Sequence, residues 1–133
     1  MYLSKLSKEQ KKLFLELCTS LSIIDRDFKE EEKNLIDQLC EEMRIKPKYE
    51  SSMNVEKAIN EIAAISNPVE KKMILVELLG IAIADKKIAS EEKEFMKNLC
   101  AAFKLKEKEL DEAITLVNEL SDTYSKFASF LRK

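Results

Sequence analysis

The stretch LSIIDRDFKEEEKNLIDQLCEEMRIK, residues 21–46, lies without a gap on IAIADKKIASEEKEFMKNLCAAFKLK, residues 81–106. With the same shift of 60, residues 11–46 give 11 identities in 36 positions, where chance in so biased a composition gives roughly three. Such a repeat predicts that one supersecondary unit occurs twice in the chain. The identical pairs are Lys11/Lys71, Lys12/Lys72, Leu15/Leu75, Ile23/Ile83, Asp25/Asp85, Glu31/Glu91, Glu32/Glu92, Lys33/Lys93, Leu39/Leu99, Cys40/Cys100 and Lys46/Lys106.

Each copy is typical of a helical hairpin. Ser7 with Gln10, and Asn67 with Glu70, have the spacing of a capping box, which predicts the start of the first helix of each copy. Pro68 stands at the first helical position, which proline favours. Apolar residues then recur at helical spacing through both helices of each copy.

The predicted fold is a single all-α domain over residues 1–133 with about seven helices. Repeat one spans about residues 8–46 and repeat two about residues 68–106, and their hairpins form a four-helix core with an approximate two-fold axis. Residues 73–84 are apolar nearly all round, which is typical of a helix at the centre of a core. The flanking helices are expected at residues 54–65, 107–120 and 122–131, the last of them capped by Ser121.

The composition favours helices and excludes several classes of function. One glycine and two prolines are too few for the turns of a β-rich protein of 133 residues. The net charge of −2 and the pI near 5.4 argue against a nucleic-acid-binding surface. The chain has no histidine, no nucleophile elbow and no glycine-rich phosphate loop, so we expect no enzymatic activity.

The sequence has the features of a soluble, cytoplasmic protein. Its first residues show no signal-peptide pattern, and its longest apolar stretch is too short to span a bilayer. Cys18, Cys40 and Cys100 lack CxxC spacing, which argues against a structural zinc site. Cys40 and Cys100 occupy equivalent positions on apolar helical faces, so we expect buried thiols and no disulfide.

Paired carboxylates follow the first helix in both copies. Asp25 precedes Glu32 by seven residues, and Asp85 precedes Glu92 by seven. The pattern A-D-x-x-I-x-x-E-E-K after an apolar helix resembles the TerB-like, or tellurite-resistance TerB, family of small all-helical domains. The resemblance covers about residues 8–118. It implies the all-helical fold, a link to tellurite resistance and related stress responses, and an acidic surface for which metal binding has been proposed.

Two interpretations of these four carboxylates remain open. As helix punctuation, Glu32 and Glu92 lie in the first turn of the second helices, where capping and the helix dipole favour glutamate. As a cation site, Asp25, Glu32, Asp85 and Glu92 offer only oxygen ligands, which suit Ca²⁺ or Mg²⁺. An EF-hand is excluded, because the twelfth position counted from each aspartate holds an apolar residue.

A second repeated feature lies at the start of the first helices. Lys11 and Lys12 recur as Lys71 and Lys72, at helix ends whose dipole does not favour cations. These lysines are either ordinary solvated residues or a docking surface for an anionic partner.

The sequence therefore predicts one of two non-enzymatic functions. The first is a stress-associated binding module of the TerB-like kind, with no firmly bound cofactor but a possible weak Ca²⁺ or Mg²⁺ site. The alternative is a protein-interaction or adaptor domain with no metal role. The expected partner is another protein, with a homodimer as a further possibility. Nucleic acid and direct membrane insertion are not expected.

Overall fold

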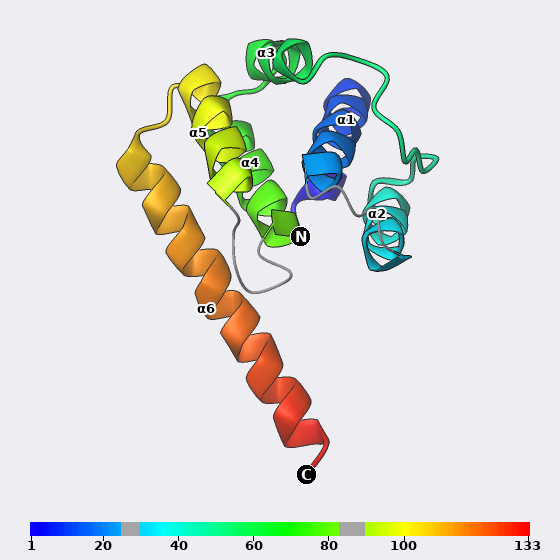
Figure 1. Ribbon diagram of the computed structural model, residues 1–133, viewed down its shortest axis with the longest axis vertical. Coiled ribbons are helices and arrows are strands. Elements are labelled where there is room, and N and C mark those ends of the chain that lie inside the picture. Colours follow the sequence, from blue (N-terminus) through cyan, green and yellow to red (C-terminus); the bar gives the residue numbers. More distant parts are fainter. Residues whose placement is uncertain (25–29, 83–89) are drawn as a thin grey trace.

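The computed structural model of this chain is helical (Figure 1). It describes residues 1–24, 30–82 and 90–133. At residues 22–24 and 31–32 it describes the backbone alone. Within these ranges, six α-helices and one short 3-10 helix confirm the predicted all-α class. In chain order they are η1 (Leu3–Lys5), α1 (Lys8–Ile24), α2 (Glu30–Met43), α3 (Val55–Ile65), α4 (Pro68–Ala82), α5 (Ser90–Phe103) and α6 (Glu107–Leu131).

The last helix differs from the prediction. Residues 107–131 form one helix rather than two, so the predicted N-cap at Ser121 is wrong. No glycine or proline interrupts this segment, and the Thr123 hydroxyl donates at 3.0 Å to the carbonyl of Glu119, one helical turn earlier. Although α6 is 25 residues long, none of the helices in the described ranges combines the length and the apolar character needed to cross a membrane.

Both predicted capping boxes are confirmed. At α1, the Gln10 backbone N–H donates to Ser7 Oγ (3.1 Å), and the Ser7 N–H donates to Gln10 Oε1 (2.8 Å). At α4, Asn67 and Glu70 make the same pair of bonds, at 2.8 and 2.9 Å. Each box satisfies N–H groups that the helix cannot pair itself, which determines where the helix begins. Gln10 is also buried and donates from Nε2 to Ser66 Oγ (3.0 Å), so this cap ties α1 to the end of α3.

Helix α1 is the most deeply buried helix. It packs on α2, α3, α4 and α5, and Figure 1 shows it between α4 and α2. Residues 13–19 of α1 are all buried, including the polar Glu16 and Thr19. Helix α4, predicted as the centre, exposes Gly80 and leaves Glu77 half-buried. The central place belongs to α1 because its residues 13–19 are buried on every side of the helix.

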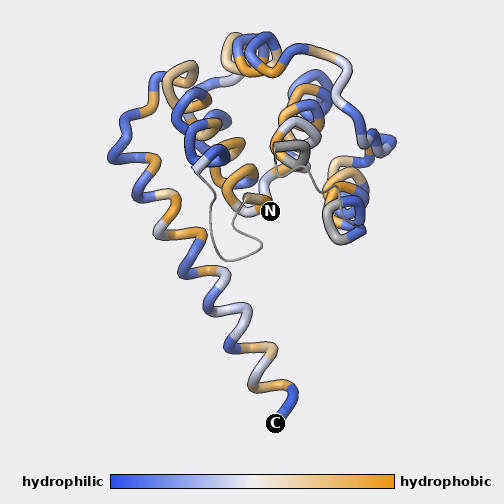
Figure 2. The backbone as a smooth tube through the Cα atoms, viewed as in Figure 1, coloured by the Kyte–Doolittle hydropathy of each residue, from blue (hydrophilic) through white to orange (hydrophobic). Residues whose placement is uncertain are grey.

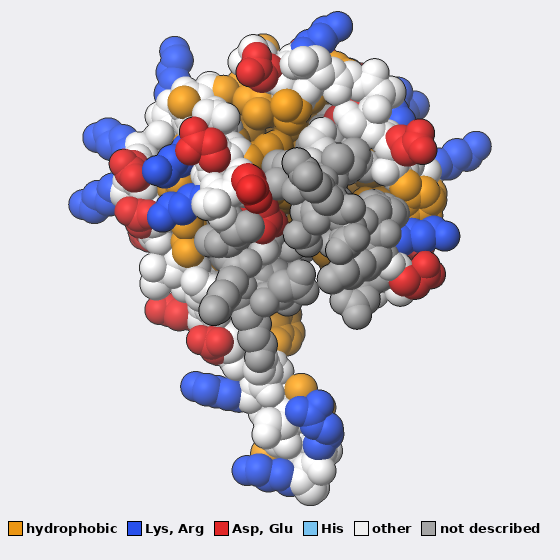
Figure 3. Space-filling model, in the orientation of Figure 1, with side chains coloured by type: hydrophobic (Ala, Val, Ile, Leu, Met, Phe, Trp, Pro, Cys, Tyr) orange, Lys and Arg blue, Asp and Glu red, His pale blue; other side chains and the backbone are white. Residues whose placement is uncertain are grey.

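The core lies among α1, α4 and α5 and is closed by α2, α3 and α6. Figure 2 shows hydrophobic residues on the inward sides of these helices, and Figure 3 shows acidic and basic side chains interspersed over the outer surface of the body. The largest fully buried side chains include Phe14, Leu17, Leu21, Ile36, Ile62, Ile74, Leu78 and Met96.

The second helices of the two repeats have the same bounds and the same C-terminal cap. Helices α2 and α5 begin and end 60 residues apart. Each is followed by a residue in the left-handed conformation, Arg44 (φ 58°) and Lys104 (φ 57°). The next N–H then donates five residues back, from Ile45 to the Cys40 carbonyl (3.0 Å) and from Leu105 to the Cys100 carbonyl (2.9 Å). Both helices therefore end in a Schellman motif.

The surroundings of the two hairpins are not equal. Helix α5 packs on α1, α3, α4 and α6, whereas α2 packs mainly on α1 and η1. In Figure 1, α2 accordingly lies at the edge of the helical body. The superposition of residues 8–46 on residues 68–106 about a two-fold axis stays a prediction.

All three cysteines are buried and free, which confirms the predicted burial of Cys40 and Cys100. Burial raises the pKa of the Cys100 thiol to about 11, and the charge of Glu109 acts in the same direction. Burial also raises the pKa of Cys18 and of Cys40. Because the thiolate is the nucleophile, these thiols serve as packing groups.

The cap after α5 leads to a test of backbone strain. Lys104→Gly is expected to raise the free energy of unfolding by about 0.5–1 kcal/mol, because glycine adopts the left-handed conformation without a Cβ clash. Urea denaturation measures the change. Lys104→Ala removes the same side chain but keeps Cβ, so it should give no gain. Equal stabilities of the two variants would contradict the left-handed conformation assigned to residue 104.

Candidate functional site

The predicted cation ligands lie mostly outside the described residues. This holds for Asp25 and Asp85 and for the side chain of Glu32. Glu92 is half-buried in the first turn of α5 and interacts with a neighbouring group. The described part of the chain contains no group of three or more His, Cys, Asp or Glu side chains that could hold a metal ion. The Ca²⁺ or Mg²⁺ site stays a prediction.

Two of the four predicted lysines line grooves, one in each repeat. Lys12 lines a large groove beside α1, and Lys72 lines a smaller one beside α4. Lys11 and Lys71, which precede them, are half-buried. The repeated lysines therefore mark two equivalent places in the two repeats.

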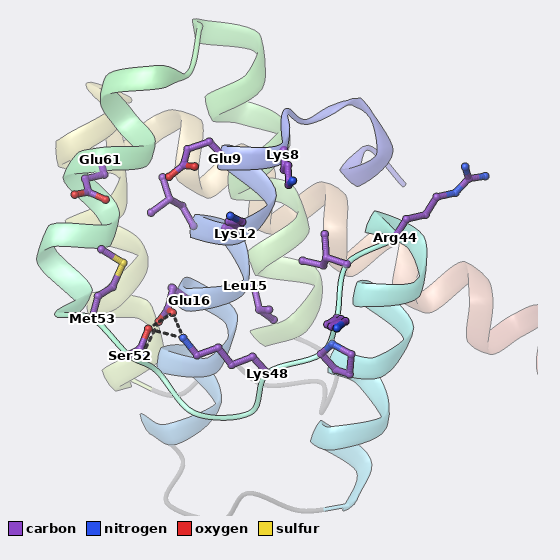
Figure 4. A pocket seen from close by; sticks show the side chains of 14 residues that line it. Lys8, Glu9, Lys12, Leu15, Glu16, Arg44, Lys48, Ser52, Met53 and Glu61 are labelled. Atoms are coloured by element: carbon purple, nitrogen blue, oxygen red, sulfur yellow. Dashed lines mark hydrogen bonds and ion pairs between the residues drawn. The ribbon is translucent and has the colours of Figure 1, made fainter.

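The larger groove, which we name the first groove, is the main candidate site (Figure 4). Helix α1 forms one wall, residues 44–53 between α2 and α3 form the other, and Glu61 of α3 completes the lining. Its volume is about 880 Å³, and ligand sites usually occupy ~300–1,000 Å³. Its apolar lining consists of Leu13, Leu15, Ile45, Pro47 and Met53.

A buried carboxylate joins the two walls of the first groove. Glu16 Oε1 accepts from Lys48 Nζ (2.7 Å) and from Ser52 Oγ (2.8 Å). Its Oε2 accepts from Ser51 Oγ (2.9 Å) and from the Ser52 backbone N–H (3.0 Å). Figure 4 shows this cluster at one end of the groove, with Lys48 reaching across to Glu16. The cluster ties residues 48–52 to the central helix.

The same hydrogen bonds keep Glu16 ionised. Burial alone acts to raise its pKa, but the bonds from Lys48, Ser52 and Ser51 outweigh this and lower the pKa from 4.5 to about 2. The carboxylate therefore stays charged at neutral pH, and each of its two oxygens accepts two hydrogen bonds. Its geometry is that of a structural clamp.

Basic side chains outnumber acidic ones around the first groove. The charged lining consists of Lys8, Lys12, Arg44, Lys46 and Lys48 with Glu9, Glu16 and Glu61. Because Lys48 and Glu16 neutralise each other, four cations remain against two carboxylates. Within the described ranges, the Lys12 ammonium group has no ion-pair partner. The groove therefore offers an apolar floor with a net positive border.

The smaller groove, which we name the second groove, is the counterpart of the first in repeat two. Its residues Lys72, Leu75, Val76 and Leu105 correspond, at the offset of 60, to Lys12, Leu15, Glu16 and Ile45 of the first groove. The main chemical difference is Val76 in the place of the buried Glu16. The offset of 60 in the sequence thus relates four lining residues of one groove to four of the other.

Helix α6 forms one wall of the second groove. Its Glu109, Glu112, Ala113 and Leu116 line the groove and leave about 190 Å³. Lys72 Nζ lies 3.6 Å from Glu109 Oε2, so the repeated lysine pairs with an acidic residue of this helix. In repeat one, the chain at this point is the non-helical segment 44–53, and the groove stays larger.

Glu16, which ties the two walls of the first groove together, was not predicted from the sequence. The available signal was a single carboxylate in the buried stretch of α1, at a position where repeat two has valine. Its partners lie more than 30 residues away, in a segment without periodicity. Glu77 of α4 has a comparable role, since it accepts from the Tyr2 N–H (2.7 Å) and holds η1 on α4.

Comparison with known proteins adds one finding. A family model described as Tellurite resistance protein TerB matches residues 48–115. The match covers the serines and the lysine that bind Glu16, helices α3, α4 and α5, and the first part of α6. Helices α1 and α2 and the end of α6 lie outside it. No curated protein and no solved structure matches the chain.

The cation hypothesis predicts a stability response to divalent ions. Millimolar Ca²⁺ or Mg²⁺ should raise the melting temperature of chelator-stripped protein weakly, by an amount that grows with ion concentration. The variant Asp25→Asn, Glu32→Gln, Asp85→Asn, Glu92→Gln should lose this gain, whereas the control Glu56→Gln, Glu94→Gln should keep it. A melting temperature unmoved by the ions would leave the carboxylates as helix punctuation.

The Glu16 clamp predicts a pH-dependent contribution to stability. Because its pKa is lower in the folded state, the stabilisation is present above pH 4.5 and is lost as the pH falls toward 2. Glu16→Gln should therefore lower the free energy of unfolding at pH 7 by about 2–3 kcal/mol, and by much less at pH 3.

Chemical denaturation at both pH values measures this difference. The control is Glu61→Gln, an exposed carboxylate of the same groove for which little change is expected. If the cost of Glu16→Gln were equal at pH 7 and at pH 3, the assigned ionisation would be wrong.

Proposed function

The chain belongs to the TerB family, and on that premise we propose that it is a non-enzymatic binding module whose first groove receives an acidic amphipathic helix of a partner protein. The family match spans more than half of the chain. The proposed occupant is defined by its chemistry: a helix with one apolar face bordered by glutamate or aspartate.

The observation that carries this proposal is the second groove. There, an acidic amphipathic helix forms the wall that faces α4: α6 packs on α4, lines the groove together with Leu75 and Val76, and places Glu109 beside Lys72. The first groove repeats the wall and the lysine, but its chain segment is not helical. The chain thus contains its own example of the complex that we propose.

The charges around the first groove support an acidic partner. Lys8, Lys12 and Lys46 line the groove with Arg44, and Figure 4 shows Lys8 and Lys12 along α1, away from the Glu16 clamp. These cations would steer an acidic helix and orient it, and the apolar floor would supply most of the affinity. The clamp keeps both walls in place, so binding would require little reorganisation.

The biological setting of this proposal comes from the family alone. The description of the family names tellurite resistance. We propose that this chain acts in tellurite resistance or in a related stress response. A weak divalent cation at the predicted carboxylates would modulate the module without changing the groove.

The proposal is tested with a peptide taken from the chain itself. A labelled peptide of residues 107–120 carries the acidic amphipathic face that lines the second groove. We expect saturable binding to the full chain by fluorescence anisotropy, with an affinity that falls as salt rises because the border contacts are electrostatic. Lys12→Glu should weaken this binding about tenfold or more.

Two controls make the test specific. Lys108→Glu changes an exposed lysine of α6 that lines neither groove, and it should leave binding unchanged. A peptide with Glu109→Gln and Glu112→Gln should bind more weakly than the native sequence. Absence of saturable binding, or equal binding to the Lys12→Glu protein, would overturn the proposed function.

A further inference from the structure

The end of α6 forms an arm that the rest of the fold does not cover. Figure 1 shows α6 extending well beyond the other helices, and none of the residues 118–133, which we name the α6 arm, is buried. Large apolar side chains are nevertheless strongly exposed along it: Tyr124 65%, Phe127 61%, Phe130 69% and Leu131 78%. A contiguous exposed apolar stripe of this kind marks an interaction surface.

The stripe on the arm continues a seam that is already used inside the molecule. Apolar residues of α6 recur at alternating spacings of three and four: Leu110, Ala113, Val117, Leu120, Tyr124, Phe127 and Leu131. This is the a/d pattern of a coiled coil. The first three are buried in the body, where α6 packs on α4 and α5, and the last four are exposed. One face of α6 therefore packs against α4 and α5 in the first half of the helix and is exposed in the second half.

We propose that the α6 arms of two copies of this chain pair antiparallel through Leu120, Tyr124, Phe127 and Leu131. A second copy supplies the same seam, so the stripe meets a matching one across a two-fold axis. This interface lies away from the first groove and does not depend on the proposed function.

The charges of the arm fix the orientation. Glu119 and Asp122 lie near the body, and Lys126, Arg132 and Lys133 lie toward the end. Figure 3 shows acidic side chains where the arm leaves the body and basic ones farther along it. In an antiparallel pair, the acidic part of each arm lies at the same level along the axis as the basic part of the other. A parallel pair would place like charges together and align the helix dipoles unfavourably.

The buried area is sufficient for a dimer. Aromatic side chains bury ~150–250 Å² each when fully covered, so the apolar residues of two arms would cover roughly 1,000 Å². Specific interfaces begin at about this size. We therefore expect a dimer of moderate affinity, in equilibrium with monomer.

The oligomeric state of the full chain tests the proposal. Sedimentation velocity over a range of concentrations should show a monomer–dimer equilibrium for the native protein. Tyr124→Glu with Phe127→Glu should weaken it by roughly 100-fold, because four carboxylates would enter the apolar seam. Ser125→Glu with Ser129→Glu adds the same charges to the opposite face of the helix and should leave the dimer intact. A native protein that stays monomeric at all concentrations would overturn the proposal. The same holds if the monomer binds anionic vesicles through the arm.

One distance tests the orientation. A spin label at Arg132→Cys is selective because the native thiols are buried. For arms that overlap over residues 119–132, antiparallel pairing separates the two labels by roughly 20 Å along the axis. Labels about 10 Å apart would show parallel pairing and refute the proposed orientation.

Discussion

The buried carboxylate of Glu16 is the interaction on which the shape of the candidate site depends. Desolvating a charge costs several kcal/mol unless donors surround it, and here Lys48, Ser51 and Ser52 provide four hydrogen bonds. All of these donors come from one non-helical segment. The clamp therefore holds that segment against the central helix, and the open groove lies beside it.

The two repeats differ most where this clamp stands. Repeat two has Val76 in the place of Glu16, and the chain that follows its second hairpin continues as helix α6 over that valine. An apolar residue at this point suits a packed helix, whereas a carboxylate requires several polar donors that a packed apolar helix face does not supply. One polar-for-apolar exchange between the repeats thus accompanies a small groove walled by a helix in one copy and a larger groove walled by a non-helical segment in the other.

Helix α6 links this local difference to the outer surface of the molecule. Its first half lines the second groove through an apolar face and a glutamate, and its second half extends the same face beyond the body. The packed first half supplies the helix nucleus, and each further residue then gains one hydrogen bond for the backbone entropy that it loses. The groove and the arm are therefore separate surfaces that share one helix.

The sequence by itself determined the elements of this protein, and the tertiary structure decided how they are used. The capping boxes at Ser7 and Asn67 and the buried cysteines were predictable, since helix starts and apolar stripes follow from residues close together in the chain. The break expected at Ser121 was wrong, because a serine caps a helix only where the backbone leaves the helical conformation, and nothing in the fold makes it do so there. Glu16 could not be assigned, since its donors are more than 30 residues distant and become neighbours only when the segment before α3 folds back on α1. The repeated lysines could be found from the sequence. Their separation into one paired and one open groove came from long-range packing of α6, which no local pattern encodes.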